Sequence, residues 1–208
     1  MKKSLLIITL GILMQHNISA QSKWGIENYN YWGRQTSGIF VPMIHFETRN
    51  NWYAEMRYNY EDAQTLSFFG GKTFSGGNAV TYNITPMTGF SVGRFTGVSL
   101  ATNIEIDWKQ FYVSSQSQYS IALKKENSNF FFTWSELGYN ISDHVFTGLA
   151  MQYTLQEDDK IFEPGIVAGF SFKNISIPFY VFSPFRAGRY FVLGLNYEYH
   201  FKKKINNR

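Results

Sequence analysis

The sequence contains no cysteine, little charge and only one long apolar run. Because none of its 208 residues is Cys, neither a disulfide framework nor a lipid-modified N-terminal cysteine is available. Beyond the N-terminal region, no apolar run approaches the roughly 18 residues that a membrane-spanning helix needs. Charged residues make up 16% of the chain. A helical membrane protein and a disulfide-stapled domain are therefore excluded.

The N-terminus has the three-part plan of a secretory signal peptide. Lys2 and Lys3 precede an apolar stretch that ends at Met14, and the small residues Ser19 and Ala20 follow. We expect residues 1–20 to be a signal peptide cleaved after Ala20, and residues 21–208 to be one exported domain ending in a short basic tail, 202–208. Without Lys2 and Lys3 the 19 basic groups fall to 17, against 15 acidic groups. This near balance gives no reason to expect a nucleic-acid partner.

What the sequence does have is aromatic residues placed at alternate positions. Aromatic residues make up 19% of the chain, yet its mean hydropathy is only −0.23. The alternation is clearest over residues 189–201, where one face is apolar and the other is largely polar. Successive side chains of a strand point to opposite sides, so this stretch predicts a strand between two different media. Its apolar face carries Phe191, Leu193, Leu195, Tyr197, Tyr199 and Phe201.

Similar alternating runs, separated by turn residues, follow one another along the whole exported chain. This pattern is typical of an all-β protein. We predict turns that include Arg49 to Asn51 and Ser114 to Ser117, and a bulge or break at Pro86, which cannot donate to a strand ladder. The count is twelve strands, or ten if the first run or the Pro86 region does not span. The twelve runs cover residues 24–33, 38–48, 52–61, 64–75, 79–93, 97–110, 119–124, 129–141, 145–156, 161–173, 175–183 and 189–201.

Two closed barrels fit this alternation. A soluble lipocalin-like binding barrel turns its apolar side inward, whereas a transmembrane barrel turns it outward to lipid. The polar face of several runs carries glycine, which weakens a water-facing strand but suits a crowded interior. We therefore predict a closed antiparallel transmembrane β-barrel with short loops. The glycines in question are Gly148, Gly165, Gly169 and Gly194.

The signal peptide, the alternating strands and a final strand ending in Phe201 resemble the outer-membrane β-barrel class of Gram-negative bacteria. The resemblance covers the whole exported chain as a pattern, without a diagnostic motif. It implies an outer-membrane location among outer-membrane lipids. It also implies that the barrel-assembly machinery reads the end of the last strand, Tyr197, Tyr199 and Phe201, as an assembly signal.

The inward faces of the predicted strands gather charges of both signs. One interpretation is a structural barrel whose salt-bridged interior blocks the lumen. The other is a small passive pore for small polar solutes, weakly selective because the signs balance. The predicted lumen-lining residues are His45, Glu47, Glu55, Arg57, Glu61, Glu105, Asp107, Lys109, Lys124, Glu163, Lys173, Glu198 and His200.

The chain offers little for catalysis or metal binding. His45 with Glu47, and Glu198 with His200, lie close together once the barrel closes, but a metal needs about three or four ligands at fixed distances. A serine hydrolase needs a serine, a histidine and an acid together, and no Gly-x-Ser-x-Gly elbow is present. We expect no cofactor, no metal and no enzymatic activity, with an outer-membrane lipid hydrolase as the less favoured alternative.

Overall fold

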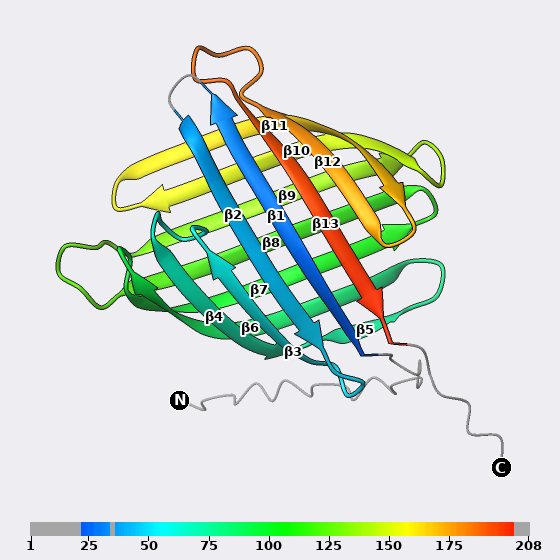
Figure 1. The fold of residues 1–208 in the computed structure, drawn as a ribbon, viewed down its shortest axis with the longest axis horizontal. Helices are drawn as coiled ribbons and strands as arrows, with labels where there is room; N and C mark the ends of the chain where they lie inside the picture. Colours follow the sequence, from blue (N-terminus) through cyan, green and yellow to red (C-terminus); the bar gives the residue numbers. More distant parts are fainter. Residues whose placement is uncertain (1–21, 34–35, 202–208) are drawn as a thin grey trace, which may run out of the picture.

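The computed structural model describes residues 22–33 and 36–201, whose strands form one closed antiparallel barrel (Figure 1). The expected signal peptide, 1–20, and the basic tail, 202–208, lie outside these residues. Within the described part of the chain, no helix is long and apolar enough to cross a membrane. The strands are β1 (Lys23–Gly33), β2 (Thr36–Glu47), β3 (Trp52–Tyr58), β4 (Thr65–Lys72), β5 (Phe74–Gly77), β6 (Thr81–Gly93), β7 (Gly97–Trp108), β8 (Phe111–Ala122), β9 (Phe130–Asn140), β10 (Val145–Gln156), β11 (Asp159–Phe172), β12 (Ile175–Phe182) and β13 (Tyr190–His200).

The ring has twelve strands, because β4 and β5 occupy one position in it. Both pair with β6 in a single register, Gly71 opposite Met87 and Phe74 opposite Ile84. The interruption between β4 and β5 falls opposite Pro86, which has no N–H to offer its neighbour. The pairing of β6 with β7 on its other side runs through Pro86 without a shift. The predicted break is therefore present, but in the strand that faces the proline.

The first and last strands close the barrel. Strand β1 pairs with β13 from Lys23 opposite His200 to Gly33 opposite Tyr190. The backbone N–H of Phe201 then donates to the carbonyl of Ser22 at 2.9 Å. Both ends of the described chain therefore lie at one end of the barrel, here called the terminus end (Figure 1). The opposite rim, which carries the β3–β4, β8–β9 and β12–β13 connections, is called the far end.

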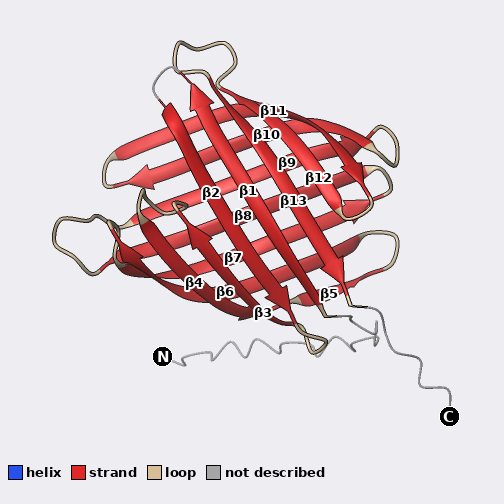
Figure 2. Ribbon diagram, viewed as in Figure 1, coloured by secondary structure: helices blue, strands red, loops and turns tan. Residues whose placement is uncertain are grey.

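The connections are short, and most lie where the sequence predicts them (Figure 2). The prediction of a turn at Ser114 to Ser117 is wrong. The chain instead reverses after Trp108, where Lys109 adopts a left-handed backbone with φ of 55°. Ser115 and Ser117 continue in β8, and their hydroxyls lie 2.8 Å from those of Ser135 and Thr133 on β9. A polar run can remain in a strand because its hydroxyls have partners next door.

The outside of the barrel is apolar, as contact with hydrocarbon requires. Outward side chains near the middle of the strands are exposed and aliphatic, such as Leu100 and Leu149, which are 67% and 61% exposed. Aromatic rings gather nearer the rims. At the terminus end, Trp24 lies 5.6 Å from the ring of Tyr197, and Tyr199 lies 5.4 Å from Phe201. Aromatic belts of this kind flank the apolar band of outer-membrane barrels.

Leu149→Arg tests the direction of the wall. Leu149 is in β10 and points outward, so the variant places a cation in the hydrocarbon. We expect the free energy of unfolding in lipid vesicles, measured by urea titration, to fall by about 2–4 kcal/mol. The control Glu126→Arg, in the exposed β8–β9 connection, should change it by less than about 0.5 kcal/mol. Equal effects in both variants would contradict an outward-facing apolar wall.

Candidate functional site: the lumen

The interior opens at the terminus end into a polar cavity of about 840 Å³, here called the vestibule. Its walls come from strands on opposite sides of the ring, including β1, β2, β6, β7 and β13. Side chains alternate along each strand, so the polar face of these strands supplies most of the lining. The charged residues lining the vestibule are Lys23, Glu27, His45, Glu47, Arg49, Lys72, Glu105, Glu198 and His200.

Glu198 of β13 is the centre of the charged contacts in the vestibule. Its carboxylate lies 3.2 Å from Lys23 Nζ, 3.6 Å from His45 Nε2 and 2.8 Å from His200 Nε2. Lys23 also lies 3.7 Å from Glu47. The last, first and second strands are neighbours in the ring, and this adjacency brings the two sequence-predicted histidine–glutamate pairs together.

The ring of His45 sits over a glycine. Gly25 of β1 faces His45 of β2, and a Cβ at Gly25 would meet the imidazole. On its other side, His45 stacks on Tyr53 at 5.9 Å between ring centroids, and its Nδ1 lies 3.5 Å from Glu27. Among the described residues no group of three or more His, Cys, Asp or Glu is arranged to hold a metal ion. The contacts of His45 are those of an ion-paired wall residue.

Deeper in the barrel, Arg57 of β3 reaches across the lumen. It is 2% exposed, its Nε donates to Glu55, and its Nη1 donates to Gln118 Oε1 of β8 at 2.8 Å. Its guanidinium also lies 4.5 Å from the ring centroid of Phe69. A charge this deeply buried is tolerable only with such partners. Strands β3 and β8 are not neighbours in the ring, so this bond bridges the interior.

The β3–β4 connection also folds inward. Strand β3 ends at Tyr58, three residues earlier than the sequence indicates, because Asn59 takes a left-handed backbone with φ of 60°. Tyr60, which the alternation places outside, therefore enters the lumen. Its hydroxyl donates to Gln116 of β8 at 3.0 Å, and its ring lies 4.4 Å from the Arg57 guanidinium.

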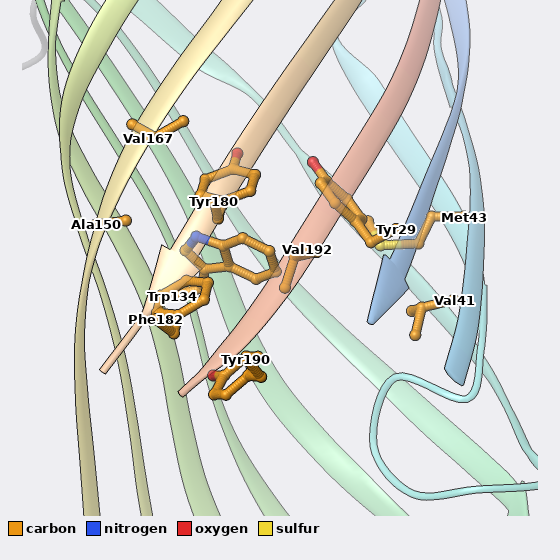
Figure 3. Close-up of a cluster of buried hydrophobic side chains, with 10 residues drawn as sticks. All are labelled: Tyr29, Val41, Met43, Trp134, Ala150, Val167, Tyr180, Phe182, Tyr190 and Val192. Carbon is orange, nitrogen blue, oxygen red and sulfur yellow. The ribbon is translucent and has the colours of Figure 1, made fainter. Parts of the chain in front are cut away.

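Aromatic side chains fill the interior toward the far end (Figure 3). Trp134 of β9 is 6% exposed and packs against Tyr29, Tyr180 and Phe182, with ring centroids 5.1, 5.0 and 5.6 Å away. Glycine on the polar face makes room for these rings, since a Cβ at Gly165 would lie 2.7 Å from Phe182. The buried cluster consists of Tyr29, Val41, Met43, Trp134, Ala150, Val167, Tyr180, Phe182, Tyr190 and Val192.

The tyrosines of this region use their hydroxyls on acceptors from other strands. Tyr180 donates to Glu136 at 2.7 Å, and Tyr190 lies 3.1 Å from both Gln152 and Glu163. Buried polar groups need such partners. Each bond links strands that are not neighbours in the ring, so the arc of the wall from β9 to β13 is tied together on its inner side.

The structure divides the predicted lumen residues into two sets. Lys109 and Lys173 lie in two-residue turns at the terminus end, each over a neighbouring aromatic ring, and Lys124 lies in the β8–β9 connection, bonded to the carbonyl of Gly93. Asp107 is exposed near the end of β7. The remaining predicted residues point inward: His45, Glu47, Glu55, Arg57, Glu61, Glu105, Glu163, Glu198 and His200.

Sequence reasoning missed the aromatic filling and two inward carboxylates, Glu27 and Glu136. A signal for both was present. Trp134 and Glu136 share one face of β9, and Tyr29 shares a face with Glu27 on β1, so parity alone places each ring beside an acid. The inward faces of β1 and β9 carry both apolar and polar residues. An analysis that assigns every apolar residue to the lipid side therefore does not identify these rings and acids as inward.

Arg57→Met tests whether the cross-lumen contact holds the interior together. The variant leaves Glu55 and Glu61 without their cation, and removing one member of a buried ion pair costs about 3–5 kcal/mol. We expect urea unfolding in vesicles to show a loss of that size. Arg57→Met combined with Glu55→Gln should recover part of it. Arg186→Met, in the exposed β12–β13 connection, should leave stability unchanged; a loss there equal to that of Arg57→Met would refute the role of Arg57.

No family model matches this sequence, and no curated protein matches it. Solved structures do. The chain resembles the KdgM porin, with a TM-score of 0.60, 14% identity, and coverage of 85% of this chain and 99% of that one. The same porin in complex with disordered oligogalacturonate gives a TM-score of 0.61 at 12% identity, with the same coverage. The NanC porin gives 0.52 at 10% identity, covering 84% of this chain and 98% of that one. This chain therefore has the fold of the outer-membrane porin barrels, which confirms the resemblance to the outer-membrane β-barrel class.

Proposed function

We propose that this protein is an outer-membrane channel that passively admits small polar solutes. The observation that carries the proposal is the lumen itself. A closed porin barrel encloses a polar vestibule of about 840 Å³, and the section beyond it is filled by side chains and by a single short connection. Within the described residues no folded domain plugs the barrel, so passage requires only that side chains and this connection rearrange.

The proposed path narrows where the vestibule ends. A solute that enters from the terminus end meets the bond of Arg57 to Gln118, the bond of Tyr60 to Gln116 and the ring of Trp134. Passage requires these groups to move apart, so the channel should conduct weakly and exclude large solutes. Polar walls replace part of a solute's hydration, which is how pores admit polar cargo.

A structural barrel with a blocked lumen is the second candidate. The bonds across the interior favour it, because Arg57 to Gln118 and Tyr180 to Glu136 link non-adjacent strands. A barrel of this kind would contribute to the membrane through its outer wall alone. The two candidates make opposite predictions for conductance.

The apolar wall supports a location among outer-membrane lipids, and we propose that residues 1–20 direct export and are cleaved. We also propose that the assembly machinery reads the end of β13. Tyr197, Tyr199 and Phe201 form a continuous outward aromatic ribbon there, 36%, 37% and 41% exposed. We assign no catalytic role. His144, in the β9–β10 turn, lies 3.1 Å from the backbone carbonyl of Ser171.

Phe201→Ala tests the assembly signal. Removal of the last ring of the ribbon should lower the fraction of folded barrel recovered from outer membranes, measured as the heat-modifiable band on a gel. Phe185→Ala, at a fully exposed position in the β12–β13 connection, is the matched control. Equal recovery of the two variants would remove Phe201 from the signal.

Planar-bilayer conductance of the refolded protein tests the channel. We expect small discrete steps from the unmodified protein, and larger steps from Tyr60→Ala and Trp134→Ala, because each variant removes a ring that fills the lumen. Phe185→Ala, outside the lumen, should conduct as the unmodified protein does.

Silence from all four proteins, each shown to be folded by heat modifiability, would overturn the channel and favour the structural barrel. Conductance that both lumen variants leave unchanged would place the path elsewhere. Steps from the two variants alone would mean that the unmodified protein is closed under these conditions by the side chains named here.

A further inference from the structure

The charge inside the barrel differs from the charge that the sequence suggests. Three lysines of the predicted lumen, Lys109, Lys124 and Lys173, lie in turns and connections, where they contact aromatic rings or a backbone carbonyl. Two unpredicted acids, Glu27 and Glu136, point inward instead. The balance of signs expected from the sequence is therefore lost.

The inward carboxylates outnumber the inward cations. Lys23 is shared between Glu47 and Glu198, and Arg57 between Glu55 and Glu61. Arg49 and Lys72 line the vestibule at its terminus-end rim, so the inward lysines and arginines of the described chain number four against eight carboxylates. The carboxylates that face the interior are Glu27, Glu47, Glu55, Glu61, Glu105, Glu136, Glu163 and Glu198.

Three of these carboxylates have only neutral hydrogen-bond partners. Glu105 accepts from Asn83 at 3.1 Å, Glu136 accepts from Tyr180, and Glu163 accepts from Tyr190. Within residues 22–33 and 36–201, no Lys, Arg or His nitrogen lies within 4.0 Å of any of the three. None of the three is therefore held in a direct ion pair.

The same three carboxylates lie at three depths along one wall. Glu105 is near the terminus end of β7, Glu136 is in the middle of β9, and Glu163 is near the far end of β11. The register connects the first two through a single residue, since Ser114 of β8 faces both. A tilted sheet carries such a row obliquely along the barrel axis. The wall formed by β7, β9 and β11 therefore presents acid from one mouth to the other.

We propose that the lumen selects for cations, and that Glu105, Glu136 and Glu163 determine this preference. The inference rests on the proposed channel function. Charged side chains that line a pore set its ion selectivity, and a narrow low-dielectric lumen concentrates their field. The substrate class that fits is a small polar solute with positive charge, because an anion would have to pass three carboxylates that are not ion-paired within the described chain.

The reversal potential in a KCl gradient across a planar bilayer tests the preference. Potassium should permeate more readily than chloride by at least about fivefold, which is the effect of one unit charge at about 4 Å in water on the cation alone. Glu105→Gln with Glu136→Gln and Glu163→Gln should bring the ratio close to one. Lys109→Gln with Lys173→Gln is the control, and because these lysines lie outside the lumen it should leave the ratio unchanged.

The widened variant Trp134→Ala is measured in parallel, so that selectivity can be read even if the unmodified protein stays closed. Conductance with equal or greater chloride permeability would overturn the cation preference and leave the channel standing. A preference that survives the triple glutamine variant would remove these three carboxylates from the role. Silence from every variant, with folding confirmed, would overturn the channel and the preference together.

Discussion

The structure depends on one constraint, that backbone N–H and C=O groups inside hydrocarbon must pair with one another. A sheet meets this requirement only when it closes, and here β1 and β13 close it along their whole length. Pro86 is a position where this pairing is incomplete. It lacks a donor, and the ladder is interrupted opposite it between β4 and β5, while the ring remains closed. Closure also determines the shape of the site, because all inward side chains must share one narrow lumen.

Hydrocarbon outside leaves the interior as the place for charge, and the chain divides that interior unequally. The terminus end holds an open polar vestibule in which Glu198 gathers a lysine and two histidines. The far end is filled by rings around Trp134 whose tyrosine hydroxyls are bonded to carboxylates and amides. Arg57 stands between these two regions. Filling of this kind stabilises the barrel and, in the proposed channel, limits what can pass.

The similarity to the KdgM and NanC porins lies in the fold. The charge and the width of this lumen are set by inward residues of this chain. Inward glutamates outnumber inward lysines and arginines, which in the proposed channel favours cations, and the short inward-folded β3–β4 connection narrows the lumen with Tyr60. Both features would affect which solutes pass, and neither changes the outer wall of the barrel. A single barrel architecture can therefore serve different cargo through changes at inward positions alone.

The sequence by itself determined the wall. Period-two alternation, short turns and glycine on the polar face were sufficient to predict a closed transmembrane barrel of twelve strands, with ten as the alternative, because each of these signals is local along the chain. Only the tertiary structure decided the lumen. Lys109 lies in a turn and not in the lumen because its own backbone is left-handed. Tyr60 faces the lumen and not the lipid because the left-handed backbone of Asn59 ends the strand before it. The bonds from Arg57 to Gln118 and from Tyr180 to Glu136 join strands distant in sequence, and such meetings are fixed by ring closure and tilt, which no local pattern contains.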